Sequence, residues 1–285
     1  MSRPTETETR YDFGRNWDSF AAQISDEAIE NAVSGLKKLT GSETGARFLD
    51  IGSGSGVHSL AALRLGAKTV RCIDYDNDSV ATTRALLTQR APNADWEARQ
   101  GDILAERASD VSDDHASDDL FDTVYSWGVL HHTGDMWRAI ENAATFVRPG
   151  GRFVIALYMK TPLCGFWKAE KYLYAKFPKL RPIFRWPFAA LLLVGTSIWK
   201  RQSPRSIIGN YRQQRGMSFL HDVDDWLGGY PYESVRNEEV VSFMASRDFE
   251  LIECFNIRRS IGLFGSGCGE WVFRRSESAT QTVLE

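Results

Sequence analysis

The residues of this chain that could do chemistry begin with a run of alternating glycines. Residues 48–56 read Phe-Leu-Asp-Ile-Gly-Ser-Gly-Ser-Gly, and helix-forming residues follow them. Glycines permit a sharp turn and let a ligand approach the main chain, and the start of the next helix offers free N–H groups. The pattern predicts a strand, a tight turn and a helix that bind a nucleotide-like ligand. Residue 57 is Val57 where the dinucleotide fingerprint needs a glycine, so the spacing departs from the nicotinamide pattern.

A second chemical signal is the acidic residue that closes the next strand-like run. Residues 69–74 read Thr-Val-Arg-Cys-Ile-Asp, and Asp74 stands 22 positions after Gly52. Folds that bind nucleotides in this way place a carboxylate at this point, where it accepts hydrogen bonds from the ribose hydroxyls. Tyr75 is the next residue and is in position to flank the base. Asp74 and Tyr75 are therefore predicted to bind the nucleoside part of the ligand.

Five motifs in this order resemble those of the class I S-adenosylmethionine-dependent methyltransferases. After the glycine turn and Asp74 come Gly101-Asp102-Ile103, then Phe121 to His132, then a Pro-Gly-Gly turn within Arg148 to Ala156. The resemblance covers residues 46–158 and continues weakly at the C-terminus. It implies S-adenosylmethionine as the cofactor, with Asp102 at the adenine amino group. The residues predicted to bind the cofactor are Asp50, Gly52, Gly54, Gly56, Asp74, Tyr75, Asp102, Ile103, Ser126 and Trp127.

Three histidines are candidates for acting on the methyl acceptor. His131 and His132 follow the fourth strand, where this fold faces the methyl group, and His221 lies next to Asp222 in a later segment. Methyl transfer is an in-line displacement in which the enzyme holds donor and acceptor in line. A hydroxyl or phenol acceptor also benefits from a general base. The alternative for the paired histidines is a structural role in the pocket wall, and for His221 it is a role in capping a helix.

The segment after the fourth strand departs from one group of relatives. Ubiquinone-biosynthesis type O-methyltransferases have Glu-x-x-Glu-His here, and this chain has Gly128, His131 and His132 at the corresponding positions. Only the histidine is kept, so no metal site is expected. An Asn/Asp-Pro-Pro-Tyr sequence is also missing after this strand, which argues against amino-methylation of adenine or glutamine.

The elements that must position these residues alternate between strands and helices. This order predicts an α/β fold, a doubly wound seven-stranded mostly parallel sheet of the Rossmann-like methyltransferase type, with a helical insertion after strand five. Strands are expected at 47–51, 69–74, 96–100, 153–158, 249–257 and 270–274, and the fourth strand with its following loop at 121–132. The expected units are an N-terminal helical segment (1–45), the cofactor-binding core (46–158), a basic aromatic helical insertion (159–232), a C-terminal helix with strands six and seven (233–275) and a tail (276–285).

The insertion at 159–232 differs from the rest of the chain in charge and composition. Residues 159–219 hold twelve Lys or Arg against Glu170 alone, a net charge of +11, and eleven aromatic residues. The longest uncharged run, 186–199, has 14 residues, fewer than the roughly 18 to 20 that span a bilayer. We expect a helical cap over the acceptor site that can rest on an anionic membrane surface, or an ordinary cap with a solvated basic side. Residues 221–232 are expected to form a hairpin-like tail that crosses the pocket mouth.

Composition narrows the class of protein and its location. The chain has 285 residues, a formal net charge of −3 and four cysteines without a C-x-x-C pair. This charge argues against a protein that coats nucleic acid, and the scattered cysteines favour a reducing compartment. The first ten residues hold no apolar core of a signal peptide, so we expect a cytoplasmic protein that can lie at the inner face of a membrane.

These observations together predict a function. We expect a methyltransferase that moves a methyl group from S-adenosylmethionine to a small-molecule acceptor, at a hydroxyl or phenol oxygen of an apolar or lipid-like compound. Two alternatives stay open. One is an RNA methyltransferase that uses the basic insertion to hold phosphates, and the other is a non-catalytic S-adenosylmethionine-binding module.

Overall fold

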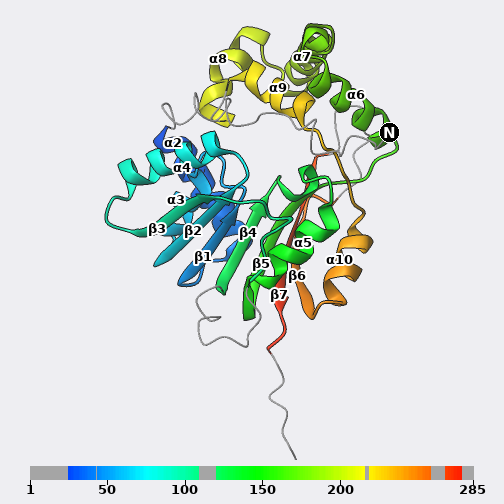
Figure 1. Cartoon of the computed structure of the whole chain (residues 1–285). Helices are drawn as coiled ribbons and strands as arrows, with labels where there is room; N and C mark the ends of the chain where they lie inside the picture. The colour runs from blue at the N-terminus through cyan, green and yellow to red at the C-terminus, as the bar shows by residue number, and fades with distance from the viewer. Residues whose placement is uncertain (1–24, 43, 109–119, 216–217, 258–266, 278–285) are drawn as a thin grey trace, which may run out of the picture.

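The chain folds around one seven-stranded sheet with helices on both faces (Figure 1). The computed structural model describes residues 25–42, 44–108, 120–215, 218–257 and 267–277. The strand order is β3-β2-β1-β4-β5-β7-β6, and β7 runs antiparallel to both of its neighbours. This confirms the doubly wound, mostly parallel sheet predicted from the sequence. The strands are β1 Arg47–Ile51, β2 Thr69–Asp74, β3 Asp95–Gln100, β4 Phe121–Trp127, β5 Val147–Tyr158, β6 Phe249–Phe255 and β7 Cys268–Arg275.

Strands β1, β4 and β5 lie in the middle of the sheet and are buried on both faces. β4 pairs in parallel with β1 on one side and with β5 on the other. Phe48, Val124 and Val154, one from each strand, are fully buried. Strands covered by helices on both faces need such nearly continuous apolar runs. Because β1, β2, β4 and β5 are parallel, their carboxyl ends meet at one edge, where open α/β sheets bind their ligands.

Two apolar clusters join the sheet to its helical layers. Helices α2, α3 and α4 pack on one face, and α5 and α10 pack on the other. The side chains of Ser25, Asp76 and Asp135 cap α2, α4 and α5 by accepting hydrogen bonds from backbone N–H groups of the first turn. The helices of these layers are α2 Asp26–Thr40, α3 Val57–Arg64, α4 Asn77–Arg90, α5 Met136–Thr145 and α10 Asn237–Ala245.

Residues 159–232, called the cap from here on, lie beyond the carboxyl end of β5. Figure 1 shows the cap above the sheet, with α7 and α8 at the top. Buried side chains of three of its helices form a small apolar core, namely Tyr174, Ala189, Phe219, Val223 and Leu227. The cap helices are α6 Cys164–Lys176, α7 Arg181–Lys200, α8 Pro204–Arg215 and α9 Phe219–Gly228, with the 3-10 turn η4 Pro178–Leu180 before α7.

The structure corrects the expected hairpin-like tail at 221–232. Most of this segment belongs to helix α9, and only the residues after Gly228 are extended. Phe219, Val223 and Leu227 recur at a spacing of four, so a helix places all three in the cap core, which a hairpin would not do. The pair Gly228-Gly229 ends this helix rather than forming the turn of a hairpin.

The structure also changes the view of the apolar run in the cap. Together, η4 and α7 form one continuous helical stretch, Pro178–Lys200, of 23 residues. Among the described residues it is the one helix long and apolar enough to cross a membrane, judged by length and composition only. Little of it is buried inside the protein. The run is therefore longer than the uncharged stretch in the sequence suggests.

Candidate active site

Three glycines turn the chain from β1 into α3. Gly52, Gly54 and Gly56 have φ angles of +77°, +54° and +77°, in the left-handed region that glycine adopts most readily. A Cβ on Gly52 would lie 2.3 Å from Val129 Cγ2, so the turn packs directly against the chain that leaves β4. No side chain caps the N-terminus of α3 at Gly56, so an anionic group of a ligand can take that place.

Asp74 ends β2 beside the glycine turn and is fixed by two backbone donors. The N–H of Gly54 donates to Asp74 Oδ2 at 2.9 Å, and the N–H of Asp76 donates to Oδ1 at 3.0 Å. Each carboxylate oxygen keeps a further lone pair for a ligand hydroxyl. Burial raises the pKa of Asp74, and these backbone hydrogen bonds oppose the rise. Tyr75 follows with about half of its side chain exposed, as a base-stacking role requires.

Asp50 lies beneath the glycine turn rather than at its surface. It is 2% exposed, and the Ser59 hydroxyl of α3 donates to its Oδ2 at 2.5 Å. Burial raises the pKa of Asp50 to about 7, and the Ser59 hydrogen bond opposes the shift. The geometry supports a role in fixing α3 against β1, which aims the helix N-terminus at the ligand. The sequence does not predict this role of Ser59, because its place on the first turn of α3 is the one feature that sets it apart.

The other residues predicted to bind the cofactor lie where β3 and β4 end. Asp102 Oδ1 accepts a hydrogen bond from Leu104 N at 3.0 Å, and Ile103 beside it is buried. The buried Ser126 donates its hydroxyl to Ile51 O at 3.0 Å and so ties β4 to β1. Trp127 is 43% exposed, and its Nε1–H donates to Glu270 Oε1 at 2.9 Å. Tyr75 and Trp127 thus present partly exposed aromatic side chains at the ends of β2 and β4.

His131 is a fully buried histidine without a polar partner in the described structure. It lies in the 3-10 turn η3 Leu130–His132, directly after β4, and neither ring nitrogen has a hydrogen-bond partner there. Its ring centroid is 4.1 Å from that of Tyr158 and 4.3 Å from that of His132. Burial lowers the pKa of His131 well below its ordinary value, and His132 and Lys171 add to this effect. His131 is therefore a neutral imidazole with unused hydrogen-bonding capacity.

The second histidine of the pair is tied to the cap. His132 Nδ1 lies 2.7 Å from the carbonyl oxygen of Pro231, and because a carbonyl only accepts, Nδ1 is the protonated nitrogen. The structure thus places His131 and His132 together beneath the cap. His221 lies in α9, and its side chain is outside the described part of the structure.

Two adjacent charged cap residues that the sequence does not single out are buried, and one of them, Lys171, lies near enough to His131 to affect its pKa. Lys171 on α6 is fully buried, and its Nζ donates to the carbonyl of Trp226 and lies 5.6 Å from the ring centroid of Tyr232. Glu170 is 5% exposed, and neither of its carboxylate oxygens has a hydrogen-bond partner in the described structure. Burial lowers the pKa of Lys171 and raises that of Glu170, while each charge partly offsets the other's shift. The one signal was Glu170 itself, the lone acid in a basic segment.

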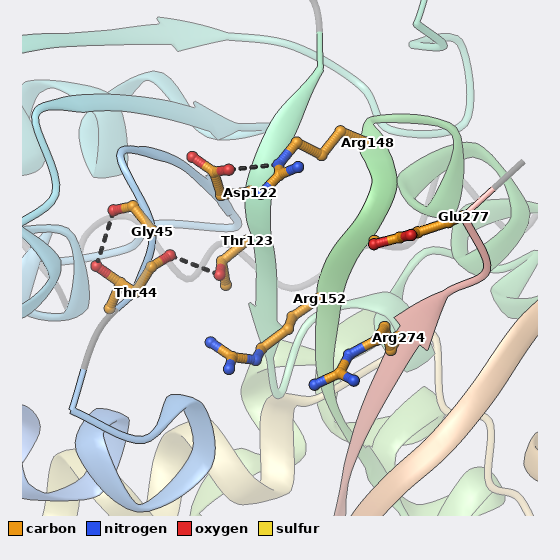
Figure 2. A pocket seen from close by; sticks show the side chains of 9 residues that line it. Thr44, Gly45, Asp122, Thr123, Arg148, Arg152, Arg274 and Glu277 are labelled. Atoms are coloured by element: carbon orange, nitrogen blue, oxygen red, sulfur yellow. Dashed lines mark hydrogen bonds and ion pairs between the residues drawn. The ribbon is translucent and has the colours of Figure 1, made fainter.

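A separate hollow of about 220 Å³ lies at the opposite end of the sheet (Figure 2). Arg148 pairs there with Asp122, and Arg152 stands directly opposite Arg274 in the β5–β7 register. The hollow is built by residues at the start of β4 and β5 and the end of β7, so it lies away from the glycine turn. It is lined by Thr44, Gly45, Asp122, Thr123, Arg148, Gly150, Arg152, Arg274 and Glu277.

Comparison with known proteins identifies the family of this site. A family model described as a methyltransferase domain matches residues 49–155, from β1 into β5. Residues 49–155 thus form a methyltransferase domain, and the relatives described below support the class I S-adenosylmethionine-dependent type. S-adenosylmethionine is thus the cofactor of this methyltransferase. The glycine turn, the uncapped start of α3, Asp74 and the exposed rings of Tyr75 and Trp127 fit that cofactor. The described residues contain no group of three His, Cys, Asp or Glu that could hold a metal ion.

Individual relatives match only part of this methyltransferase. The 27-O-demethylrifamycin SV methyltransferase of Amycolatopsis mediterranei is 27% identical over 146 residues, 51% of this chain and 50% of that protein. A ubiquinone biosynthesis O-methyltransferase of Parvibaculum lavamentivorans is 29% identical over 115 residues, 40% of this chain and 41% of that protein. The chain thus spans about half the length, or less, of these curated relatives. The N-methyltransferase NodS from Bradyrhizobium japonicum has the same fold, with a TM-score of 0.52 at 13% identity, covering 96% of this chain and all of that one.

Proposed function

We propose that this chain transfers a methyl group from S-adenosylmethionine to a small apolar acceptor that enters between the sheet edge and the cap. The observation that carries the proposal is His131, a buried neutral imidazole without a polar partner in the described structure, directly after β4 and beneath the cap. Unpaired buried polar groups cost free energy, so those that persist in a structure call for an explanation. A hydroxyl group of a bound acceptor would supply the missing hydrogen bond.

The chemistry asks the protein mainly for positioning. S-adenosylmethionine supplies an electrophilic methyl group on its sulfonium, which the acceptor oxygen displaces in line. The acceptor O–H bond breaks as the O–CH₃ bond forms, and the released proton needs a base. His131, neutral at physiological pH, has a lone pair that can accept this hydrogen bond and then the proton. His132, fixed by its bond to Pro231, packs against the His131 ring and helps to keep it in place.

The walls around His131 favour an apolar, ring-containing acceptor. Tyr158, Tyr232 and Trp226 are partly or fully buried near the histidine pair and Lys171. Aromatic side chains with a few polar groups are the usual lining of small-molecule sites. Two relatives support oxygen as the methylated atom, since one is named for O-demethylrifamycin and the other as an O-methyltransferase of ubiquinone biosynthesis. We therefore propose a hydroxyl or phenol oxygen of an apolar or lipid-like compound as the acceptor.

We also propose that the enzyme works in the cytoplasm. Four free cysteines, one of them fully buried beside Ser59, support a reducing compartment. An apolar acceptor of the proposed kind partitions into membranes, so we propose that the enzyme reaches the inner face of a membrane through its cap.

The test follows the methyl label and the histidine. Label from S-adenosylmethionine is traced into lipids, small polar molecules, RNA and protein of a fractionated extract, and turnover is then measured on the acceptor found. His131→Phe keeps a flat ring against Tyr158 and removes both nitrogens, so we expect turnover to fall by about 10²- to 10⁴-fold with S-adenosylmethionine binding unchanged. His131→Asn, which restores one polar atom, is the partial-rescue control.

Two results would contradict the proposal. Label that enters RNA alone would replace the small-molecule acceptor with a nucleic acid. Turnover of His131→Phe within a few-fold of the native enzyme would make the histidine part of the pocket wall. His221 and the acidic side of α9 would then be the next candidates for the base.

A further inference from the structure

Helix α7 carries two faces that differ in their surroundings. Four side chains of one face, Phe184, Phe188, Leu192 and Leu193, pack against the cap core around the buried Ala189. The opposite face is exposed, and none of its residues from 182 to 199 is charged or polar. Figure 1 shows α7 at the top of the molecule, above the sheet. The exposed residues of the face are Pro182, Ile183, Trp186, Pro187, Ala190, Leu191, Val194 and Ile198.

The exposed face of α7 carries more exposed large apolar side chains than any other element of the described structure. Ile183 is 65% exposed and Ile198 is 73%. Ile183, Leu191, Val194 and Ile198 follow helical spacing, so they form one continuous stripe. Outside the cap, the exposed large apolar side chains of the described residues are Tyr75 and Trp127 at the cofactor site and Ile252 on β6. Contiguous patches of this kind mark interaction surfaces, whereas single exposed residues do not.

The charges around the stripe indicate what it meets. Glu170 is the only acidic residue between 159 and 219, and it is buried. Exposed cations therefore flank the stripe at both ends of α7 and on the adjoining helices without competing exposed acids. They are Lys168, Lys176, Lys179, Lys200, Arg201 and Arg205. A partner that complements this surface has an apolar interior for the stripe and negative charge at its surface for the cations. A bilayer with acidic headgroups has both properties.

We infer that the outer face of α7 binds an anionic bilayer surface, with the helix lying in the plane of the interface. The inner face of α7 is part of the cap core, and Arg185 pairs with Asp224 of α9 at 2.9 Å. Arg181 Nε–H also donates to the carbonyl of Tyr174 at 3.1 Å. A transmembrane course would break these contacts, although the helix is long enough for one. Trp186 lies on the same exposed face as the stripe, with a ring system suited to the headgroup boundary.

This inference deepens the proposed function, because a bilayer is the reservoir of an apolar acceptor and the cap is the part of the enzyme nearest to it. Binding itself needs neither the acceptor nor the cofactor. It can therefore be measured on the full chain alone, independently of methyl transfer.

The experiment is co-sedimentation of the full chain with phosphatidylcholine vesicles, with and without phosphatidylserine. We expect binding to the anionic vesicles that weakens as salt is raised. The triple variant Ile183→Ser, Leu191→Ser and Ile198→Ser should bind roughly tenfold or more weakly, because it removes three apolar anchors. Ile252→Ser, which changes one exposed isoleucine on β6, is the matched control and should bind like the native chain. Lys176→Gln with Lys179→Gln and Arg201→Gln should lose binding chiefly at low salt.

Several outcomes overturn the inference. Absence of binding at low salt, or equal binding by the triple variant and the native chain, excludes this face as the lipid contact. Sedimentation velocity of the free chain tests a second copy as the occupant, since a dimer that the triple variant dissociates would assign the stripe to self-association. S-adenosylmethionine binding by each variant reports on folding. Failure to bind vesicles with methyl transfer intact rejects the membrane surface and leaves the proposed reaction standing.

Discussion

The core and the cap of this methyltransferase treat buried charge differently. In the core, Asp50 and Asp74 are held by hydrogen bonds from Ser59, Gly54 and Asp76. In the cap, the carboxylate of the buried Glu170 accepts no hydrogen bond from a described residue, and Lys171 next to it is fully buried. Such hydrogen bonds stabilise a buried carboxylate and fix its orientation. The cap, in contrast, buries a carboxylate without this support among the described residues.

The two regions also differ at their surfaces. The core encloses its apolar side chains in two large clusters, whereas the cap has a small core of five buried residues and exposes a whole helical face. The core is therefore a structure whose apolar contacts are complete without the cap. The features of the cap fit the two partners that we propose for it, an acceptor on the side of the sheet and a membrane surface at α7. Four predictions test this contrast, beginning with the largest expected effect.

The strongest test of the core is the glycine turn. Gly52→Ala places a methyl group 2.3 Å from Val129 at a φ of +77°, so we expect S-adenosylmethionine affinity to fall by at least about 100-fold, equivalent to about 3 kcal/mol. Gly66→Ala is the matched control, because Gly66 has φ +94° but open space around it. It should cost only about 1 to 2 kcal/mol of stability. Calorimetric titration and thermal unfolding measure both, and equal affinities in the two variants would contradict a tightly packed turn.

In the cap, the test is to remove one or both of the adjacent buried charges. Lys171→Met leaves Glu170 buried without its neighbouring cation and the Trp226 carbonyl without its donor, and unsatisfied buried polar groups of this kind cost about 1 to 3 kcal/mol. Adding Glu170→Gln removes the stranded charge, so the double variant should recover most of this stability. Urea unfolding of the three proteins gives the comparison.

The pH dependence of the Lys171→Met variant supplies its control. Burial raises the pKa of Glu170, so the folded state binds its proton more tightly than the unfolded state does. Stability from this group is present at low pH and is lost as pH rises through the raised value. The defect of Lys171→Met should therefore be smaller at acidic pH than at neutral pH. A defect independent of pH would mean that lost packing, and not stranded charge, is responsible.

The buried carboxylate of the core gives the third prediction. Asp50 has a folded pKa of about 7 against an ordinary value of 3.8, so the folded state takes up a proton between these two values. The free energy of unfolding of the ligand-free enzyme should fall as pH rises across this window. The side-chain amide of an Asp50→Asn variant can still accept the Ser59 hydrogen bond but does not titrate. The part of the slope due to Asp50, about 2 kcal/mol between about pH 5 and pH 7, should therefore disappear. Denaturant titrations at several pH values check this, and parallel slopes in the two proteins would contradict it.

The sequence predicted the core far better than the cap, for a physical reason. In the core, local signals and global fold agree, since apolar strands such as 47–51 end in glycines and α4 begins at the capping residue Asp76. Asp74 and Trp127, predicted to bind the cofactor, lie at the carboxyl ends of β2 and β4. Tertiary packing alone determines that Glu170 and Lys171 are buried and that the outer face of α7 is exposed. Local sequence patterns do not predict either feature. The prediction of a hairpin-like tail at 221–232 was wrong. The spacing of four residues between Phe219, Val223 and Leu227 is typical of a helix, and the Gly228-Gly229 pair ends that helix. The sequence also has Trp17 and Phe20 ahead of α2, where we expect them to pack on the sheet or to cover the ligand, and both lie outside the described residues.

Two ion pairs of equal length provide the smallest test of the contrast. Arg185 and Asp224 join α7 to α9 at 2.9 Å with exposed side-chain fractions of 30% and 17%, while Arg90 and Asp26 pair at 2.9 Å on the core with 33% and 78%. Arg185→Gln leaves a largely buried carboxylate that keeps only the Tyr174 hydroxyl at 2.6 Å among its described partners, so we expect a loss of about 1 kcal/mol. Arg90→Gln leaves a carboxylate that water already solvates and should cost about 0.3 kcal/mol. Hydrogen exchange should place the Arg185→Gln loss in the cap helices, because those amides open with the cap. Equally small losses of stability in the two variants would show that the polar contacts of the cap are as solvated as those on the core surface. The apolar inner face of α7 alone would then keep this helix packed against the cap.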